Sequence, residues 1–239
     1  QGIGEGGMGF GVNGEGRDVN PDYAPIDLDV QPVRTPSAMN GAYQEVTVWN
    51  GQFGATGPNA GTEYSWQIGT PKQENILGFQ GLETQAIAGL DVHRLTIDPN
   101  ALAAQGYTEL FDAAFPEADA DNRYTRINAG LAIAAYERTM LANRAPFQRW
   151  LRGEYEAMGE IEKEGALLFF DKAGCVDCHT GPALNSMAFY ALGMDDLRNC
   201  PEPTFQTPTF DRTNLGRGGF TDRPEDMYKF KVPQLYNLA

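Results

Sequence analysis

The sequence predicts a mainly α fold with long irregular loops, and two observations carry this prediction. Apolar side chains recur at helical spacing between about residues 99 and 172. Half of the 28 glycines lie in residues 1–70, and glycine and proline become frequent again in residues 195–225. Since each interior glycine costs a helix about 1 kcal/mol relative to alanine, we expect a helical body joined and wrapped by long connections.

The N-terminal third is expected to be structured coil. Residues 1–16 are too rich in glycine for a helix, and residues 17–75 are interrupted by prolines yet carry large apolar side chains such as Trp49 and Trp66. No basic and apolar leader stands at the start, so no signal peptide is predicted in this sequence.

Helices are predicted in the body that follows. We expect them at Ala101–Phe115, from a cap at Asp121 or Asn122 to about Asn143, from Pro146 through Leu151, at Glu160–Lys172, and in a short final stretch at Pro233–Leu238. The helix at 160–172 is expected to bury Ile161, Ala166, Leu167, Phe169 and Phe170.

Charge and composition exclude several classes of function. The chain has 239 residues, with 18 Lys and Arg against 32 Asp and Glu, for a formal net charge of −14. Nucleic acid and anionic lipid would repel such a chain, whereas a basic protein partner would be attracted. No apolar run is long enough to span a membrane, and three cysteines are too few for a disulfide scaffold.

The most informative motif is Cys175-Val176-Asp177-Cys178-His179, a C-x-x-C-H sequence typical of covalent c-type haem attachment. Two thiols one turn apart can add to the two vinyl groups of a haem, and the adjacent imidazole can then bind the iron. We therefore expect one haem c bound through Cys175 and Cys178, with His179 as the metal ligand.

Two other uses of these cysteines compete with haem. A disulfide between Cys175 and Cys178 would suit a redox motif, but no βαβ pattern surrounds it. A structural zinc site would need Cys200 and His93 to complete a Cys3His set, and their spacing is irregular.

Several segments, taken in order, resemble the bacterial di-haem cytochrome c peroxidase family and its methylamine-utilisation relatives. The matching stretches are Arg34–Asn40 (RTPSAMN), Val48–Gly51 (VWNG), Glu83–Ala86 (ETQA), Ala132–Thr139 (AIAAYERT), Gly165–Gly181, Gly216–Arg217 and Phe230–Asn237 (FKVPQLYN). Each is weak alone, and their number and order make the resemblance specific.

The resemblance implies cytochrome c-like domains. Residues 1–140 would be the remainder of the first, peroxidatic domain plus joining helices, and residues 141–239 the second domain with the haem site. Family members carry two C-x-x-C-H motifs, and the single one here matches the second. The first would precede Gln1 and the usual ligand Met would follow Ala239. We therefore expect a longer protein with a second haem, or one that has lost it, and assign none of Met187, Met194 and Met227 as a ligand.

The resemblance also suggests candidate catalytic residues. Trp49 resembles the tryptophan between the two haems, although burial of a large aromatic would explain it equally. Glu83 resembles a glutamate near the peroxide-binding haem, where it would move protons, although it would also suit the first turn of a helix.

Two interpretations remain open for each of four other side chains. His93 could ligate a second haem but is more simply an ordinary core or surface histidine. Arg138 and Arg217 could pair with haem propionates or be ordinary surface charges. Cys200 is expected to be a free thiol or to bridge to a cysteine elsewhere.

The function implied by the resemblance is reduction of hydrogen peroxide. A small donor protein of the cytochrome c or cupredoxin type would reduce the haem at His179, and the electron would pass by way of Trp49. Covalent haem assembly implies export, so we expect the periplasm or cell surface, and a homodimer or larger assembly is compatible. The alternative is a non-catalytic c-type cytochrome subunit, for electron transfer or structure, within a larger envelope assembly.

Overall fold

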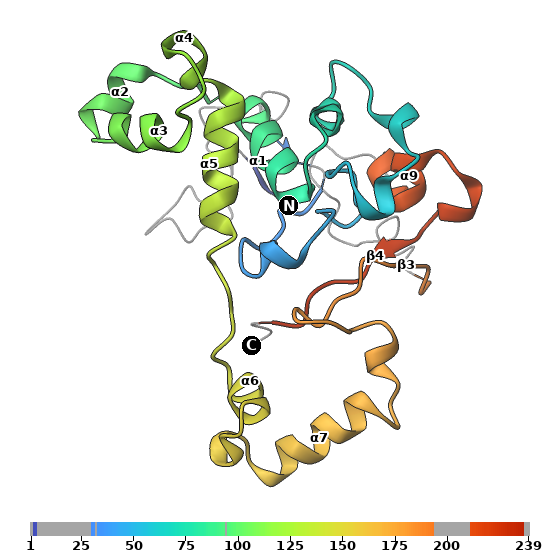
Figure 1. Cartoon of the computed structure of the whole chain (residues 1–239). Helices are drawn as coiled ribbons and strands as arrows, with labels where there is room; N and C mark the ends of the chain where they lie inside the picture. Colours follow the sequence, from blue (N-terminus) through green and yellow to red (C-terminus); the bar gives the residue numbers. More distant parts are fainter. Residues whose placement is uncertain (1, 4–29, 32, 94, 194–210, 237–239) are drawn as a thin grey trace, which may run out of the picture.

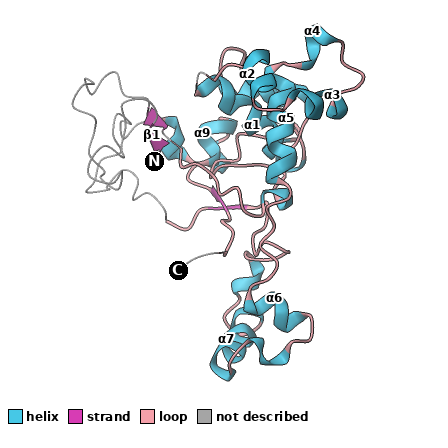
Figure 2. Cartoon of the chain, turned by 90° about the vertical axis from the view of Figure 1, so that its left-hand side faces the viewer, coloured by secondary structure: helices cyan, strands magenta, loops and turns pink. Residues whose placement is uncertain are grey.

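Two parts of the molecule stand apart in the computed structural model, which describes residues 2–3, 30–31, 33–93, 95–193 and 211–236. The larger part contains α1 to α5 and α9, and the smaller part contains α6 and α7 (Figure 1). The extended segment 140–145 connects them, and the view turned by 90° shows the same separation (Figure 2).

Helices make up most of the regular structure in the described residues, so the predicted mainly α class is confirmed. They are α1 (Gly81–Val92), α2 (Pro99–Ala104), α3 (Thr108–Ala114), α4 (Ala120–Arg123), α5 (Arg126–Glu137), α6 (Pro146–Leu151), α7 (Glu160–Phe170) and α9 (Arg217–Thr221). Strands are two residues long and form two antiparallel pairs: β1 (Gly2–Ile3) with β2 (Val30–Gln31), and β3 (Phe189–Tyr190) with β4 (Phe230–Lys231). Short 3-10 turns occupy much of residues 41–77, as expected for structured coil.

The core lies where α1 packs on α5. Leu82 and Ala86 of α1 meet Ala134 of α5, and Ile87 is fully buried. Gly130 permits this close approach, because a Cβ placed there would lie 2.4 Å from Ile87 Cγ1 and 2.8 Å from its Cα. The larger part is therefore built around one tight helix pair.

The prediction of one continuous helix over 101–115 is wrong, because two helices form there. Gly106 adopts a φ of 75°, which a continuing α-helix does not allow, and the chain divides into α2 and α3. Helix α5 is capped by the side chain of Thr125, which accepts a hydrogen bond from Asn128 N, rather than by Asp121 or Asn122. It ends at Glu137, earlier than predicted.

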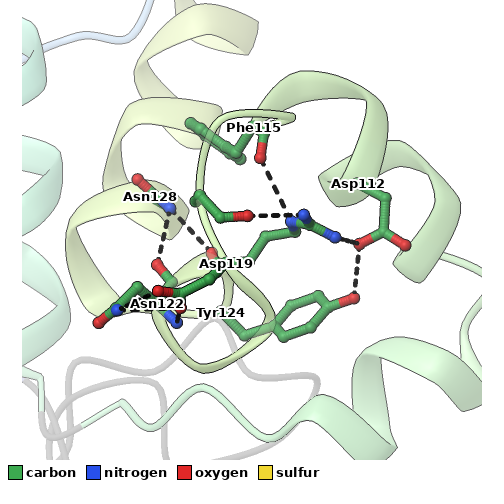
Figure 3. Close-up of polar contacts among 8 residues, drawn as sticks. Asp112, Phe115, Asp119, Asn122, Tyr124 and Asn128 are labelled. Carbon is green, nitrogen blue, oxygen red and sulfur yellow. Dashed lines mark hydrogen bonds and ion pairs between the residues drawn. The ribbon is translucent and has the colours of Figure 1, made fainter.

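The corner between α3 and α5 is held by the side chain of Arg123. Its guanidinium donates to Asp112 Oδ1 at 2.8 Å and to the carbonyls of Phe115 and Ala118, and Tyr124 Oη donates to the same Asp112 oxygen (Figure 3). These bonds lower the pKa of Asp112, with Arg123 as the main cause. This polar network lies beside an apolar cluster in which Phe115 and Tyr124 pack against Phe111, so both kinds of contact hold the corner.

Near the C-terminus, the secondary structure predicted from the sequence is wrong in two places. Residues 232–235 are irregular rather than helical, and residues 237–239 of that predicted helix lie outside the described residues. Conversely, α9 forms inside a stretch predicted to be loop, because Gly218 and Gly219 fit against Met227 and the Arg212 carbonyl, where a Cβ would clash.

The smaller part lacks a hydrophobic core of its own. Helices α6 and α7 follow the predicted positions, but Ile161, Leu167 and Phe170 are 84%, 66% and 41% exposed, so the predicted buried face of α7 is wrong for the chain alone. Within residues 141–193, Ala183 is the one apolar side chain that is buried.

The parts predicted as two domains share the C-terminal segment. Residues 211–236, grouped above with the haem domain, hydrogen-bond into the larger part through Arg217 and Lys231. No helix in the described portion of the chain has the length and apolarity needed to cross a bilayer.

Candidate haem site

The C-x-x-C-H motif forms a single tight turn. Gly174, with a φ of 66°, follows the end of α7 at Phe170 and is the N-cap of the 3-10 turn Cys175–Asp177. His179 N donates to Cys175 O at 2.9 Å, so one hydrogen-bonded turn of the backbone carries both thiols and the imidazole. Cys175 and Cys178 are free and half-buried, so both thiols are available on one turn.

The ring of His179 is oriented by a backbone carbonyl. Its Nδ1 lies 3.0 Å from Leu184 O. A carbonyl oxygen can only accept, so Nδ1 must carry the proton, and in the neutral ring Nε2 keeps its lone pair. A ring nitrogen bonded in this way fixes the tautomer and leaves the other nitrogen as a metal ligand.

An apolar hollow of about 250 Å³ lies beside this histidine. Phe147 of α6, Ala166 and Phe169 of α7, and Leu184 contribute to its lining. The Phe169 and His179 ring centroids are 6.5 Å apart. Two free thiols, an oriented imidazole and uncovered apolar side chains together fit a covalently attached haem.

Trp49 is fixed by its backbone and by one aromatic neighbour. Its carbonyl accepts from Lys231 N at 2.7 Å, and its ring meets Phe230 edge-on with centroids 6.2 Å apart. The indole Nε1 is buried and has no acceptor among the described residues. The indole N–H of Trp49 is therefore a buried donor for which the described residues supply no acceptor.

Arg217 is buried next to the same segment, with only 4% of its surface exposed. It donates to Asn59 Oδ1 at 2.6 Å, to Pro58 O at 2.7 Å, and more weakly to the carbonyls of Asn50 and Gly51. Burial lowers its pKa to about 10. Because neutral acceptors surround the guanidinium, Arg217 locks the turn after Trp49 in place.

Lys231 is a second buried cation, 9% exposed, and its backbone N–H bonds to the Trp49 carbonyl. Its ammonium donates to Gln44 Oε1 at 2.8 Å and contacts Val232 O at 3.4 Å. Burial lowers its pKa from the usual 10.5 to about 8.

Glu83 forms a bidentate ion pair with Arg138 of α5. Arg138 Nε and Nη2 donate to the two carboxylate oxygens at 2.7 and 2.9 Å, and Nη2 also reaches Gln80 Oε1. This pairing raises the pKa of Arg138. Glu83 therefore faces α5, and its partner Arg138, a candidate for propionates, is already engaged.

The opposite face of α1 borders a different cavity, of about 290 Å³. Its polar lining includes Arg34, Gln85 and His93, and its apolar lining includes Val48 and Phe53. His93 follows the last turn of α1, is exposed, and lines this cavity rather than the hollow at Phe169 and Leu184.

Of Cys200, Met194 and Met227, Met227 is the one whose surroundings the structure describes. Cys200 and Met194 lie outside the described residues, and Met227 packs against Gly218. Among the described residues no three His, Cys, Asp or Glu side chains gather as a metal site, so the zinc alternative finds no cluster there.

Comparison with known proteins shows the family. Residues 12–156, more than half of the chain, match the sequence model of the di-haem cytochrome c peroxidases. The chain belongs to this family. The matched range contains Trp49, Glu83 and Arg138 and ends before the C-x-x-C-H turn.

Individual relatives agree with this assignment. The chain is 33% identical to the cytochrome-c peroxidase IdrP1 of Pseudomonas sp. (strain SCT), over 48% of the chain and 35% of the relative. It is 27% identical to the methylamine utilization protein MauG of Methylophilus methylotrophus, over 86% of the chain and 51% of the relative. The chain thus spans about half or less of the length of these curated relatives.

A solved structure shows the same fold. A MauG-like protein associated with microbial copper homeostasis superposes with a TM-score of 0.56 at 23% identity, covering 87% of this chain and 56% of that one. The predicted cytochrome c-like architecture is confirmed at the level of fold.

Sequence reasoning did not single out Lys231 as a buried charge or Gln85 as part of the cavity beside α1. Lys231 lies between Phe230 and Val232, but Lys229 stands two residues earlier in the same stretch, so the sequence alone does not show which lysine is buried. Gln85 lies two residues from Glu83, and on a helix that spacing places it on a different face.

Proposed function

We propose that this chain binds a c-type haem at Cys175, Cys178 and His179 and transfers electrons for the reduction of hydrogen peroxide. The observation that carries the proposal is the bond from His179 Nδ1 to Leu184 O, which leaves Nε2 free beside two unpaired thiols. The uncovered apolar surface of α7 supports it, because a body of this size without a core needs a large apolar group to pack on.

When bound, the haem supplies one-electron redox chemistry at its iron. Cys175 and Cys178 would tether it, His179 would present Nε2, and Phe169, whose ring centroid lies 6.5 Å from that of His179, would add apolar surface next to it. Trp49 is the proposed route for electrons toward the larger part, since its ring is rigidly held by Phe230 and its backbone by Lys231.

Peroxide reduction consumes two electrons and two protons for each pair of water molecules formed. Glu83 is the proposed proton-transfer residue on the strength of the family resemblance. Its carboxylate accepts two hydrogen bonds from Arg138, which hold it in a fixed orientation on α1. The names of the peroxidase relatives support the reaction, and the whole reaction belongs to a protein longer than this chain.

The second candidate is a non-catalytic c-type cytochrome subunit. The observation that favours it is the bidentate pair between Glu83 and Arg138, which gives Glu83 a purely structural role. In that role the haem at His179 would pass electrons within a larger assembly, and Glu83 would serve only to join α1 to α5.

Location and partner follow from the chemistry. Covalent haem attachment occurs outside the cytoplasm, so we place the protein in the periplasm or at the cell surface. With a formal net charge of −14, its electron donor is expected to be a small protein with a basic surface, of the cytochrome c or cupredoxin type.

The test uses the natural full-length protein. Intact mass and a pyridine haemochrome assay give the number of attached haems, and the Cys175→Ser/Cys178→Ser variant should lose one. Peroxide consumption with a reduced donor then separates the two functions: turnover supports the peroxidase, and its absence with haem attached supports the carrier. Unchanged haem content in the double variant would refute the site.

A further inference from the structure

Lys231 is the one buried cation near Trp49 whose hydrogen-bonding capacity the described residues do not fill. Arg217, its counterpart, directs its guanidinium at four neutral acceptors. The Lys231 ammonium has three N–H donors and one short bond, to Gln44 Oε1, with a second contact at 3.4 Å. No carboxylate within the described ranges pairs with it.

An uncompensated ammonium is costly to bury. Even after relaxation, moving a charge out of water costs several kcal/mol, and an anion in contact offsets part of that cost. This chain has a large excess of acidic residues, yet none of those described lies against Lys231. The described residues therefore leave room for an anion at this ammonium, and the propionates of the proposed haem are carboxylates of that kind.

Lys231 is tied to the loop that follows the haem motif. Its strand β4 pairs with β3, with Lys231 opposite Phe189. The next residue, Val232, donates to Ala188 O at 3.1 Å, and Tyr236 Oη donates to Pro182 O at 2.7 Å. Residues 182–188 are the same loop whose Leu184 carbonyl orients His179. The ammonium and the imidazole thus belong to one connected frame.

We propose that Lys231 binds a propionate carboxylate of the haem attached at Cys175 and Cys178. This inference rests on the proposed function, because it requires that haem. The ammonium pairs with the carboxylate while Gln44 fixes the lysine side chain, and the backbone N–H of Lys231 ties β4 to the Trp49 carbonyl. Lys231 is a positioning residue that holds the haem edge and sets its electrostatic environment.

The experiment measures haem midpoint potentials in the full-length protein by spectroelectrochemical titration. Lys231→Met removes the charge, and Lys231→Gln removes it while keeping a polar group for Gln44, so at least one variant should fold. Loss of a cation beside a propionate favours the oxidised haem, so the His179 haem should have a lower potential in both. The matched control is Lys229→Met, which removes a charge two residues earlier, where Lys229 is partly exposed and lies 3.8 Å from Asp226.

Each outcome of the titration either supports or overturns the assignment of Lys231 to a haem propionate. A lower potential of the His179 haem in the Lys231 variants, with Lys229→Met near wild type, supports the proposal. Equal potentials in all variants, an equal shift in the Lys229 control, or a shift confined to a second haem overturns it. Intact mass is recorded first: if no haem is attached at Cys175 and Cys178, the proposed function itself fails, which distinguishes that failure from an error about Lys231.

Discussion

At the scale of single residues, the sequence identified the chemistry of the haem turn but not the charges around it. The C-x-x-C-H spacing alone specifies which atoms could bind haem, because attachment depends on local covalent geometry. Arg138 and Arg217 were the candidates for propionates, and both are engaged elsewhere in the structure. Which cation lacks a partner depends on contacts between segments far apart in sequence, so Lys231 could not be singled out from the sequence.

The Glu83–Arg138 pair is expected to stabilise the contact between α1 and α5. Glu83→Gln should lower the free energy of unfolding by about 1–2 kcal/mol, because the pair is bidentate and its side chains are only 15% and 31% exposed. Chemical denaturation of Glu83→Gln, Arg138→Met and the double variant measures their coupling. Glu154→Gln is the control, since the Arg149–Glu154 pair is about half exposed and should be worth less than about 0.5 kcal/mol. Equal losses at both sites would contradict this ranking.

The pH dependence of stability reports on the surroundings of Lys231. In the chain alone the pKa of Lys231 is about 8 against 10.5 when unfolded, so between these values the unfolded chain binds more protons and stability rises with pH. A propionate at the ammonium would raise the folded pKa and flatten that rise. We expect denaturation of the haem-loaded protein from pH 7.5 to 10.5 to give the same slope in wild type and Lys231→Met. A rise present in wild type and absent from the variant would mean that no anion is bound.

At the scale of elements, helix positions were predictable where the pattern was local, and helix ends were not. Apolar spacing located α5, α6 and α7, but the break at Gly106 and the cap at Thr125 depend on single backbone conformations. Helix α9 was missed because its two glycines weaken any helix signal, and tertiary contacts with Met227 and Arg212 decide the outcome.

The approach of α1 to α5 depends on Gly130. Gly130→Ala would place a methyl group against the Ile87 backbone, and we expect a net loss of about 1–2 kcal/mol after the gain in helix propensity. Gly89→Ala is the matched control, because a Cβ there meets nothing within 4 Å. It should stabilise α1 by about 1 kcal/mol. Thermal or denaturant unfolding of both variants checks the opposite signs, and a stabilised Gly130→Ala would show that the helices are less tightly packed.

Helix α7 should tolerate charge at one position and not at another. Ala166 lines the hollow beside His179, so a carboxylate introduced there by Ala166→Asp would be forced against the haem. We expect a several-fold lower yield of haem-loaded protein, measured as the ratio of Soret to protein absorbance. Ile161→Asp, at an 84% exposed site in the first turn of α7, should retain the wild-type ratio, because an acidic side chain is favourable near a helix N-terminus. Equal ratios for the two variants would place the haem elsewhere.

At the scale of the whole molecule, the two parts differ in how they are stabilised. The larger part has buried helix contacts of its own, whereas the smaller part exposes the apolar face of α7 and is joined to the rest by segment 140–145 and by the bond network at Tyr236 and Pro182. Sequence patterns correctly predicted that α7 has one apolar face. They could not show that its apolar face stays uncovered by protein, since that depends on what the rest of the chain leaves unfilled.

The net charge should govern how fast a donor reduces the protein. With 32 acidic and 18 basic side chains, long-range attraction speeds encounter with a basic donor, and salt screens charges separated by more than about 8–10 Å near physiological ionic strength. Stopped-flow reduction of the full-length protein by a basic cytochrome c should therefore slow as ionic strength rises from about 0.01 to 0.5 M. Reduction by a small neutral reductant serves as the control and should stay nearly constant, since it has no charge to steer. A donor rate that is independent of salt would mean that the donor docks on a local apolar surface, and that the acidic excess of the chain serves solubility rather than recognition.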